Sequence, residues 1–231
     1  MNILYVSMNR REKMLGWPWL ICCALVIPAL FHLWSSPLSF CLEAAIGCAG
    51  ALLIFHSFLR ASLHVPHTTP AQILLKALLG LIISFVTTIV MNDLFFFYMP
   101  QFFSYADYGP MYYNVNEAAF AEIARECFPL TALAFVVLMP ITEELLFRGL
   151  LFGSLFRLNR VLAYAVSVSI FAFLPTIGLI GHYPAIYIAL NFLQYVPLGL
   201  ILGWVYTSTE TIITPIVLRM VLHAIAICFM R

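Results

Sequence analysis

Residues 128–156 read FPLTALAFVVLMPITEELLFRGLLFGSLF, and this stretch decides the fold. It is long enough to cross a membrane, because about 20 mostly apolar residues in a helix span the hydrocarbon layer. Its charged residues, Glu143, Glu144 and Arg148, lie near its middle. One ionised side chain at the bilayer centre costs at least about 2.5–3.5 kcal/mol. These three residues are therefore the first candidates for a functional site.

The whole chain shares this membrane character. Of its 231 residues, 64% are hydrophobic and 9% are charged, whereas a soluble domain has about 45–50% apolar and about 25% charged residues. Lipid is the solvent that suits a surface with so few charges. The formal net charge of +1 gives no electrostatic indication of nucleic-acid binding. The six cysteines lie in or beside apolar runs, and we expect them to be buried apolar side chains.

Seven segments are long and apolar enough to be transmembrane helices. They cover residues 15–34, 38–59, 72–99, 128–156, 161–180, 185–206 and 211–230. Prolines and short polar clusters separate these segments, as expected of connections between helices. The predicted fold is therefore all-α, a polytopic membrane bundle of about seven transmembrane helices.

Lysine and arginine residues predict the orientation of the bundle. If the segments alternate in direction, three basic clusters fall on one side of the membrane. The clusters are Arg10, Arg11 and Lys13; Arg60 and Lys76; and Arg157 and Arg160. Because basic residues are enriched in cytoplasmic connections, we expect a cytoplasmic N-terminus and an outer C-terminus. Residues 117–127 (EAAFAEIAREC) alternate apolar and charged positions with helical spacing, which predicts an amphipathic helix on the outer interface.

The spacing of the charged residues predicts one ion pair and one free acid. Arg148 follows Glu144 by four residues, on the same helix face and in the favourable order for a pair. Glu143 points about 100° away from Glu144 and is left without a partner on its own helix. A carboxylate in this position is suited to activating a water molecule. The seventh segment adds Arg219 and His223 near its middle.

The sequence Glu143–Gly149 (EELLFRG) resembles the EExxxR motif of the CPBP family, the CAAX-processing and bacteriocin-processing intramembrane proteases. The similarity extends over about residues 128–226. It includes residues 195–206 (YVPLGLILGWVY) and 211–218 (TIITPIVL), which resemble the family's penultimate helix and the start of its last one. The resemblance divides the chain into residues 1–116, N-terminal helices without a recognised motif, and residues 117–231, a CPBP-like core.

The resemblance also implies roles for the motif residues. In the family, the first glutamate and a histidine of an FxxxH motif activate the attacking water, and the second glutamate pairs with the arginine. An HxxxN motif supplies another histidine and an asparagine. By this resemblance Glu143 is the general base, and Glu144 with Arg148 is a structural pair. These enzymes are described either as metalloproteases or as metal-free, so a divalent metal such as zinc is possible by resemblance.

The second and third motifs depart from the family pattern. The FxxxH position reads FAFLP, with Pro175 where the histidine is expected. The HxxxN position reads RMVLH, with Arg219 in place of histidine and His223 in place of asparagine. Proline has no side-chain donor or acceptor, and arginine stays protonated. A glutamate-only site would hold zinc poorly, because a catalytic zinc has three protein ligands. Arg219 near Glu143 would also occupy that carboxylate.

Two other histidines are alternatives for the missing ones. His223 lies one turn beyond Arg219, about 6 Å along the helix axis, and is a candidate site residue. His182 lies in the connection after Pro175 and would need that connection to fold back. The other interpretations are an interfacial position for His182, a polar contact within the bundle for His223, and a purely structural ion network at Glu143, Glu144 and Arg148.

Two functions remain open on these residues. The first is an intramembrane endopeptidase, weakened by the replaced histidines, that cleaves peptides or protein tails near the bilayer with Glu143 as the base. The second is a non-catalytic pseudoprotease that acts as a membrane scaffold or partner-binding protein. A small transporter is less favoured, because no pair of interrupted helices occupies matching halves. The expected partners are a peptide or membrane protein and the lipid bilayer, and the resemblance implies a location in the bacterial plasma membrane.

Overall fold

A computed structural model describes residues 6–31, 36–63, 69–98 and 114–229 of the chain. All regular elements in these ranges are helices. In chain order they are α1 (Arg10–Ile21), η1 (Cys22–Val26), α2 (Ile27–Phe31), α3 (Pro37–Ile54), α4 (His56–Ser62), α5 (Pro70–Asn92), η2 (Asp93–Tyr98), α6 (Val115–Glu126), α7 (Phe128–Ala132), η4 (Leu133–Leu138), α8 (Met139–Glu144), η5 (Leu145–Phe152), α9 (Gly153–Phe156), α10 (Arg160–Phe173), η6 (Leu174–Leu179), α11 (Ala185–Thr209) and α12 (Ile213–Phe229). The predicted all-α membrane bundle is confirmed.

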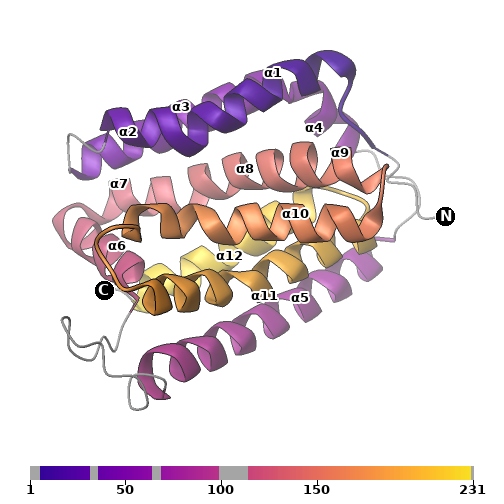
Figure 1. The fold of residues 1–231 in the computed structure, drawn as a ribbon. Helices are drawn as coiled ribbons and strands as arrows, with labels where there is room; N and C mark the ends of the chain where they lie inside the picture. The colour runs from indigo at the N-terminus through magenta and orange to yellow at the C-terminus, as the bar shows by residue number, and fades with distance from the viewer. Residues whose placement is uncertain (1–5, 32–35, 64–68, 99–113, 230–231) are drawn as a thin grey trace.

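Consecutive helices join into rods that run in alternating directions (Figure 1). Six of these rods are long and apolar enough to cross a membrane. They are Arg10–Leu30, Pro37–Ile54, Pro70–Phe95, Phe128–Phe156, Arg160–Leu179 and Ala185–Thr209. The shorter apolar helix α12 runs alongside them, and the start of α1 and the end of α12 lie at opposite ends of the bundle in Figure 1. The chain is therefore a multi-pass membrane protein.

The rod Phe128–Phe156 lies at the centre of the bundle. Half of its most hydrophobic 18-residue window is buried, against 33% or less in the other five rods. Its segments contact α3, α10, α11 and α12, and every residue of η5 is buried. The charged residues that the sequence singled out therefore lie among neighbouring helices and away from lipid.

Proline sets the local geometry of this central rod. Met139 precedes Pro140 and donates its N–H to the Ala134 carbonyl, five residues earlier instead of four. The resulting π-helical turn, η4, ends where the proline ring would clash with a regular α-helix. The π-helical turn η1 ends just before Pro28 in the same way. Such turns leave backbone carbonyls that can accept hydrogen bonds from other side chains.

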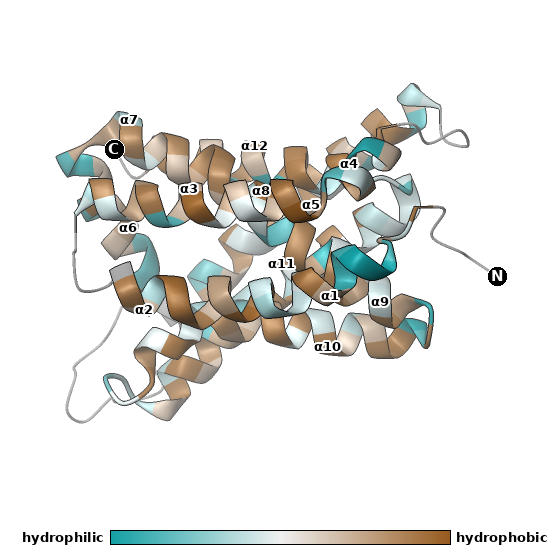
Figure 2. Cartoon of the chain, turned by 90° about the horizontal axis from the view of Figure 1, so that it is seen from above, coloured by the Kyte–Doolittle hydropathy of each residue, from teal (hydrophilic) through white to brown (hydrophobic). Residues whose placement is uncertain are grey.

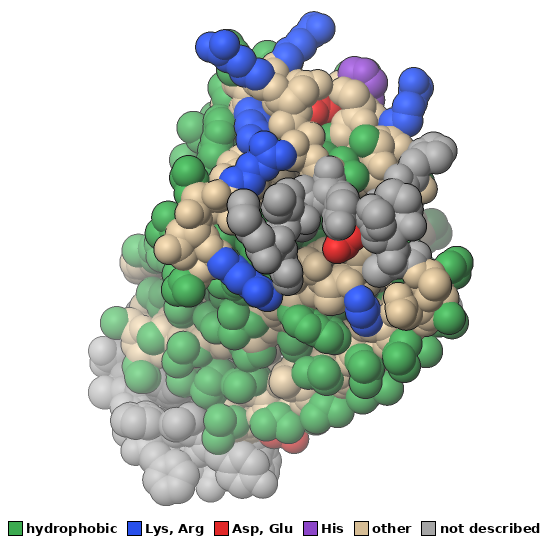
Figure 3. Space-filling model, turned by 90° about the vertical axis from the view of Figure 1, so that its right-hand side faces the viewer, with side chains coloured by type: hydrophobic (Ala, Val, Ile, Leu, Met, Phe, Trp, Pro, Cys, Tyr) green, Lys and Arg blue, Asp and Glu red, His purple; other side chains and the backbone are tan. Residues whose placement is uncertain are grey.

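The surface separates apolar flanks from polar ends. Hydrophobic residues predominate along the helices in Figure 2, and many of the hydrophilic ones lie toward their ends. The large exposed apolar side chains include Leu74, Leu78, Ile82, Val86 and Ile89 on α5, as expected for a face in contact with lipid. Figure 3 shows lysine and arginine side chains gathered on the end of the bundle that carries α4 and α9.

The amphipathic helix predicted at residues 117–127 is present as α6. It packs against α7 and α3 at the end of the bundle opposite the basic one (Figure 1). Asn114 caps its first turn by accepting from the Asn116 N–H. Thr131 closes the corner between α6 and α7, because its hydroxyl donates to the carbonyls of Ile123 and Cys127.

Candidate functional site

Four charged side chains form an ion network between the central rod and the last helix. Arg148 Nε lies 3.3 Å from Glu144 Oε2. Arg219, on α12, pairs through Nη2 with Glu143 Oε2, and its Nη1 lies 3.8 Å from Glu144 Oε1. The side chains of Glu144 and Arg148 are fully buried, whereas Glu143 is 23% exposed. The two carboxylates and two guanidinium groups balance each other, which makes their burial tolerable.

The ring of Phe171 completes this network. Its centroid lies 4.3 Å from Arg148 Cζ and 4.7 Å from Arg219 Cζ, within the distance at which a guanidinium is attracted to an aromatic face. Arg148 also donates from Nη2 to the Gly199 carbonyl at 3.4 Å. Phe171 is the first residue of the degenerate FxxxH position, so this position still contributes to the site through its phenylalanine.

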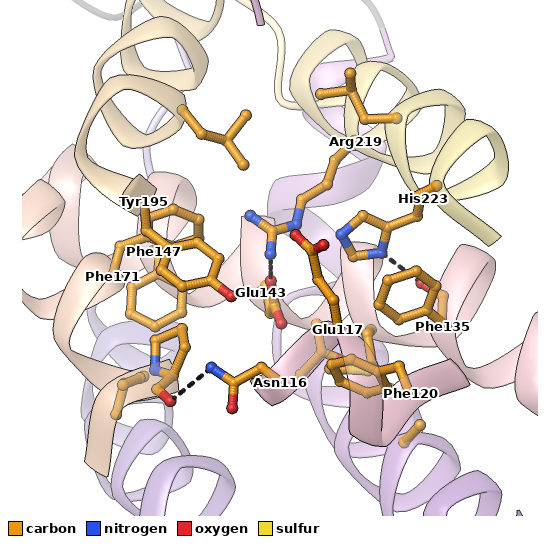
Figure 4. Close-up of a pocket in the computed structure, with 18 of the residues that line it drawn as sticks. Asn116, Glu117, Phe120, Phe135, Glu143, Phe147, Phe171, Tyr195, Arg219 and His223 are labelled. Carbon is orange, nitrogen blue, oxygen red and sulfur yellow. Dashed lines mark hydrogen bonds and ion pairs between the residues drawn. The ribbon is translucent and has the colours of Figure 1, made fainter. Parts of the chain in front are cut away.

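A cavity of about 1220 Å³, which we call the chamber, opens beside the ion network. Glu143 and Arg219 reach it from α8 and α12, and Glu117 reaches it from α6 (Figure 4). Most of its wall is apolar and aromatic. Ligand pockets commonly measure about 300–1000 Å³ and combine such walls with a few polar groups. The chamber is therefore large enough for several side chains of a peptide.

His223 faces the chamber in a fixed orientation. Its Nδ1 lies 2.6 Å from the Phe135 carbonyl, and its ring stacks on the Phe135 ring with centroids 4.2 Å apart. In the π-helical register the donor to Phe135 would be residue 140, and Pro140 has no N–H. A carbonyl can only accept, so Nδ1 donates, and in a neutral ring the lone pair is then on Nε2.

Polar bonds fix the first turn of α6 over the chamber. Asn116 Nδ2 donates to the Pro175 carbonyl at 3.2 Å, and Asn114 Nδ2 donates to Gln194 Oε1 at 2.7 Å. The backbone N–H of Val115 donates to the Tyr187 hydroxyl. These bonds hold α6 against η6 and α11, and they place Glu117 toward the chamber.

The structure brings most of the predicted site residues together. Glu143, Glu144, Arg148 and Arg219 form the ion network, and Pro175, Arg219 and His223 line the chamber with Glu143. His182 is exposed on a turn and is not among the residues that line the chamber. The fold-back considered for His182 is therefore absent.

Sequence reasoning missed Glu117 and Asn116, which both line the chamber. The pattern of residues 117–127 predicted a helix at the interface and assigned its acids to the outer surface. Glu117 and Phe120 are three residues apart and therefore share a helix face. This face could have been identified as one that mixes an acid with an aromatic, but the pattern alone did not show that it covers a cavity.

The residues of the site do not fit a metal ion. Among the described residues there is no group of three His, Cys, Asp or Glu side chains close enough together to hold one. Arg219 stands where the family pattern has a histidine, and a guanidinium is never a ligand.

Comparisons with known proteins agree with the motif. The family model described as type II CAAX prenyl endopeptidase Rce1-like matches residues 125–225, from the end of α6 into α12. No curated protein and no solved structure gave a significant match. The matched segment contains the ion network, Pro175 and His223, and it supports a function of the CAAX-type intramembrane protease kind. Residues 125–225 of this membrane protein thus match the Rce1-like model, which agrees with the resemblance of the EExxxR segment to the CPBP family.

Proposed function

We propose that the protein binds an apolar peptide or protein tail within the membrane without hydrolysing it, as a pseudoprotease of the CPBP type. The observation that carries this proposal is the ion pair between Glu143 and Arg219. A general base must present a free lone pair to water. Here the carboxylate is engaged by a guanidinium, which cannot accept the proton in its place.

The chamber supports the binding part of the proposal. Its volume of about 1220 Å³ and its largely apolar lining suit a peptide segment. It lies beside the ion network at the centre of a multi-pass bundle, so a ligand reaching it would come from the membrane or its interface. Binding by such a site requires no proton transfer and tolerates the loss of both motif histidines.

A weak hydrolase is the second candidate, and one observation favours it. Glu143 is 23% exposed and shares the chamber with His223. If a substrate displaced Arg219, the Glu143 carboxylate could take a proton from water while the water oxygen attacks a peptide carbonyl. The C–N bond would then break, and the proton on Glu143 would pass to the leaving amine.

One experiment separates the two candidates. The purified chain in lipid nanodiscs is incubated with a library of apolar peptides, and both retention and cleavage are followed by mass spectrometry. The parallel variants are Glu143→Ala, the double variant Pro175→His with Arg219→His, and that double variant with Glu143→Ala added. We expect the native chain to retain peptides uncut.

The variants give each result a meaning. Cleavage by the double variant that disappears when Glu143→Ala is added would mark the native chain as a retired protease. Cleavage by the native chain that is lost in Glu143→Ala would establish the weak hydrolase and refute the proposal. If neither the native chain nor any variant retains or cleaves a peptide, both candidates are excluded.

A further inference from the structure

The chamber region carries more negative than positive charge. Glu143 pairs with Arg219 and Glu144 pairs with Arg148, so the ion network is neutral. Glu117 also lines the chamber and makes no ion pair with any residue in the described part of the chain. Arg219 is the only lysine or arginine among the described residues that line the chamber.

An acceptor on α12 faces the same space as Glu117. Because Nδ1 of His223 donates to the Phe135 carbonyl, Nε2 presents a lone pair toward the chamber. Ring contacts connect the two residues: Phe120 lies 4.8 Å from Phe135, and Phe135 lies 4.2 Å from the His223 ring. Glu117 is one turn before Phe120, and Figure 4 shows its carboxylate pointing toward the part of the chamber where Arg219 and His223 lie.

We propose that the peptide bound in the chamber carries a primary ammonium group, which Glu117 and Nε2 of His223 bind between them. This inference rests on the peptide-binding function proposed above. An ammonium has three N–H donors and no acceptor, so it matches a carboxylate and a neutral imidazole lone pair. Its charge offsets the excess carboxylate, and the Phe120 and Phe135 rings provide an aromatic wall suited to a cation. The ammonium can come from a lysine side chain or from a free N-terminus.

Three peptides with the same apolar sequence test the charge and distinguish its source. One contains a lysine and has an acetylated N-terminus. The second replaces the lysine with norleucine and has a free N-terminus. The third has norleucine and an acetylated N-terminus, so it carries no ammonium group at the lysine position or at the N-terminus. Each peptide is labelled, and its Kd for the full chain in nanodiscs is measured by fluorescence anisotropy.

We expect one of the two ammonium peptides to bind about tenfold or more tightly than the uncharged peptide, because the uncharged peptide lacks the charge-assisted hydrogen bonds to Glu117 and His223. The peptide that gains affinity identifies the source of the ammonium. Glu117→Gln, which keeps the shape of the side chain, should remove the gain. His223→Phe should reduce it while preserving the ring stack on Phe135. Glu122→Gln is the matched control, because Glu122 is exposed on the same helix.

The possible failures are distinguishable. Equal Kd values for all three peptides would overturn the ammonium inference and leave peptide binding intact. A gain that survives in Glu117→Gln would also overturn it, because the cation would then bind elsewhere. Binding of none of the peptides would refute the proposed function and the inference together. The size-exclusion elution volume and apparent Tm of each variant establish that it is folded.

Discussion

At the scale of single residues, the ion network explains how four charges are accommodated inside a membrane bundle. Glu144 and Arg148 are fully buried and pair along one rod, as their spacing of four residues predicted. Arg219 comes from another helix and contacts both glutamates. Each carboxylate therefore has a guanidinium, and the cost of removing a lone charge from water is avoided.

Removal of Arg219 should show how much the stability of the bundle depends on its ion pair with Glu143. In Arg219→Ala the Glu143 carboxylate loses its partner, and we expect a loss of about 3 kcal/mol of stability, because breaking a buried pair leaves an uncompensated charge. The double variant Arg219→Ala with Glu143→Ala should recover most of this loss. Thermal unfolding in detergent measures both changes. Arg157→Ala is the control, because Arg157 is exposed, and it should change the stability little. A double variant no more stable than Arg219→Ala would contradict the pairing.

Glu117 should give the stability a distinctive pH dependence. Burial raises the pKa of the Glu117 carboxyl above its ordinary value of 4.5. The folded chain then binds this proton more tightly than the unfolded chain does. The resulting stabilisation is complete below pH 4.5 and is lost as the pH rises through the raised folded value. Glu117→Gln carries no charge at any pH, so it should equal the native chain at about pH 4 and exceed it at about pH 8.

Apparent Tm values measured across this range test the Glu117 prediction. The exposed Glu122 on the same helix is the control, and Glu122→Gln should run parallel to the native chain. A Glu117→Gln curve that also runs parallel would show that burial leaves the Glu117 proton affinity unchanged.

At the scale of helices, the sequence predicts well where each helix lies along the chain, and it predicts less well which side chains of different helices contact one another. The long apolar runs locate each rod to within several residues, because a run of about 20 apolar residues matches the length of a helix that satisfies its own backbone in lipid. The pair Glu144–Arg148 also follows from local spacing. The contact between Arg219 and Glu143 depends on how α12 packs against α8, and only the family resemblance pointed to it. The position of Glu117 over the chamber depends on bonds to η6 and α11 that no local pattern contains.

Gly80 should be a point where one rod cannot accept a larger residue. A Cβ at Gly80 would lie 2.7 Å from Val205 Cγ2 and 3.1 Å from Leu218 Cδ2, and the β-branched Val205 side chain is fully buried and stiff. We expect Gly80→Ala to destabilise the packing of α5 against α11 and α12 by about 1–3 kcal/mol, the usual cost of overpacking. Gly178→Ala is the control, since nothing lies within 4 Å of its Cβ. An unchanged apparent Tm in Gly80→Ala would refute this close approach.

At the scale of the whole molecule, the distribution of charge predicts how the bundle sits in the membrane. Lysine and arginine gather at the end that carries the start of α1 and the connection between α9 and α10 (Figure 3). Basic residues are favoured on the cytoplasmic side, so this end should face the cytoplasm. The end that carries α6 and the entrance to α11 should face outward.

Labelling of single cysteines measures this orientation. The native cysteines are replaced first, because all six are free thiols. Leu158→Cys then reports the basic end, where Leu158 is 78% exposed, and His182→Cys reports the other end, where His182 is exposed. A membrane-impermeant maleimide should label His182→Cys in intact cells and label Leu158→Cys only after lysis. The reverse pattern would invert the predicted orientation. Labelling of both in intact cells would place the two connections on one side, which a rod α10 that crosses the membrane does not allow.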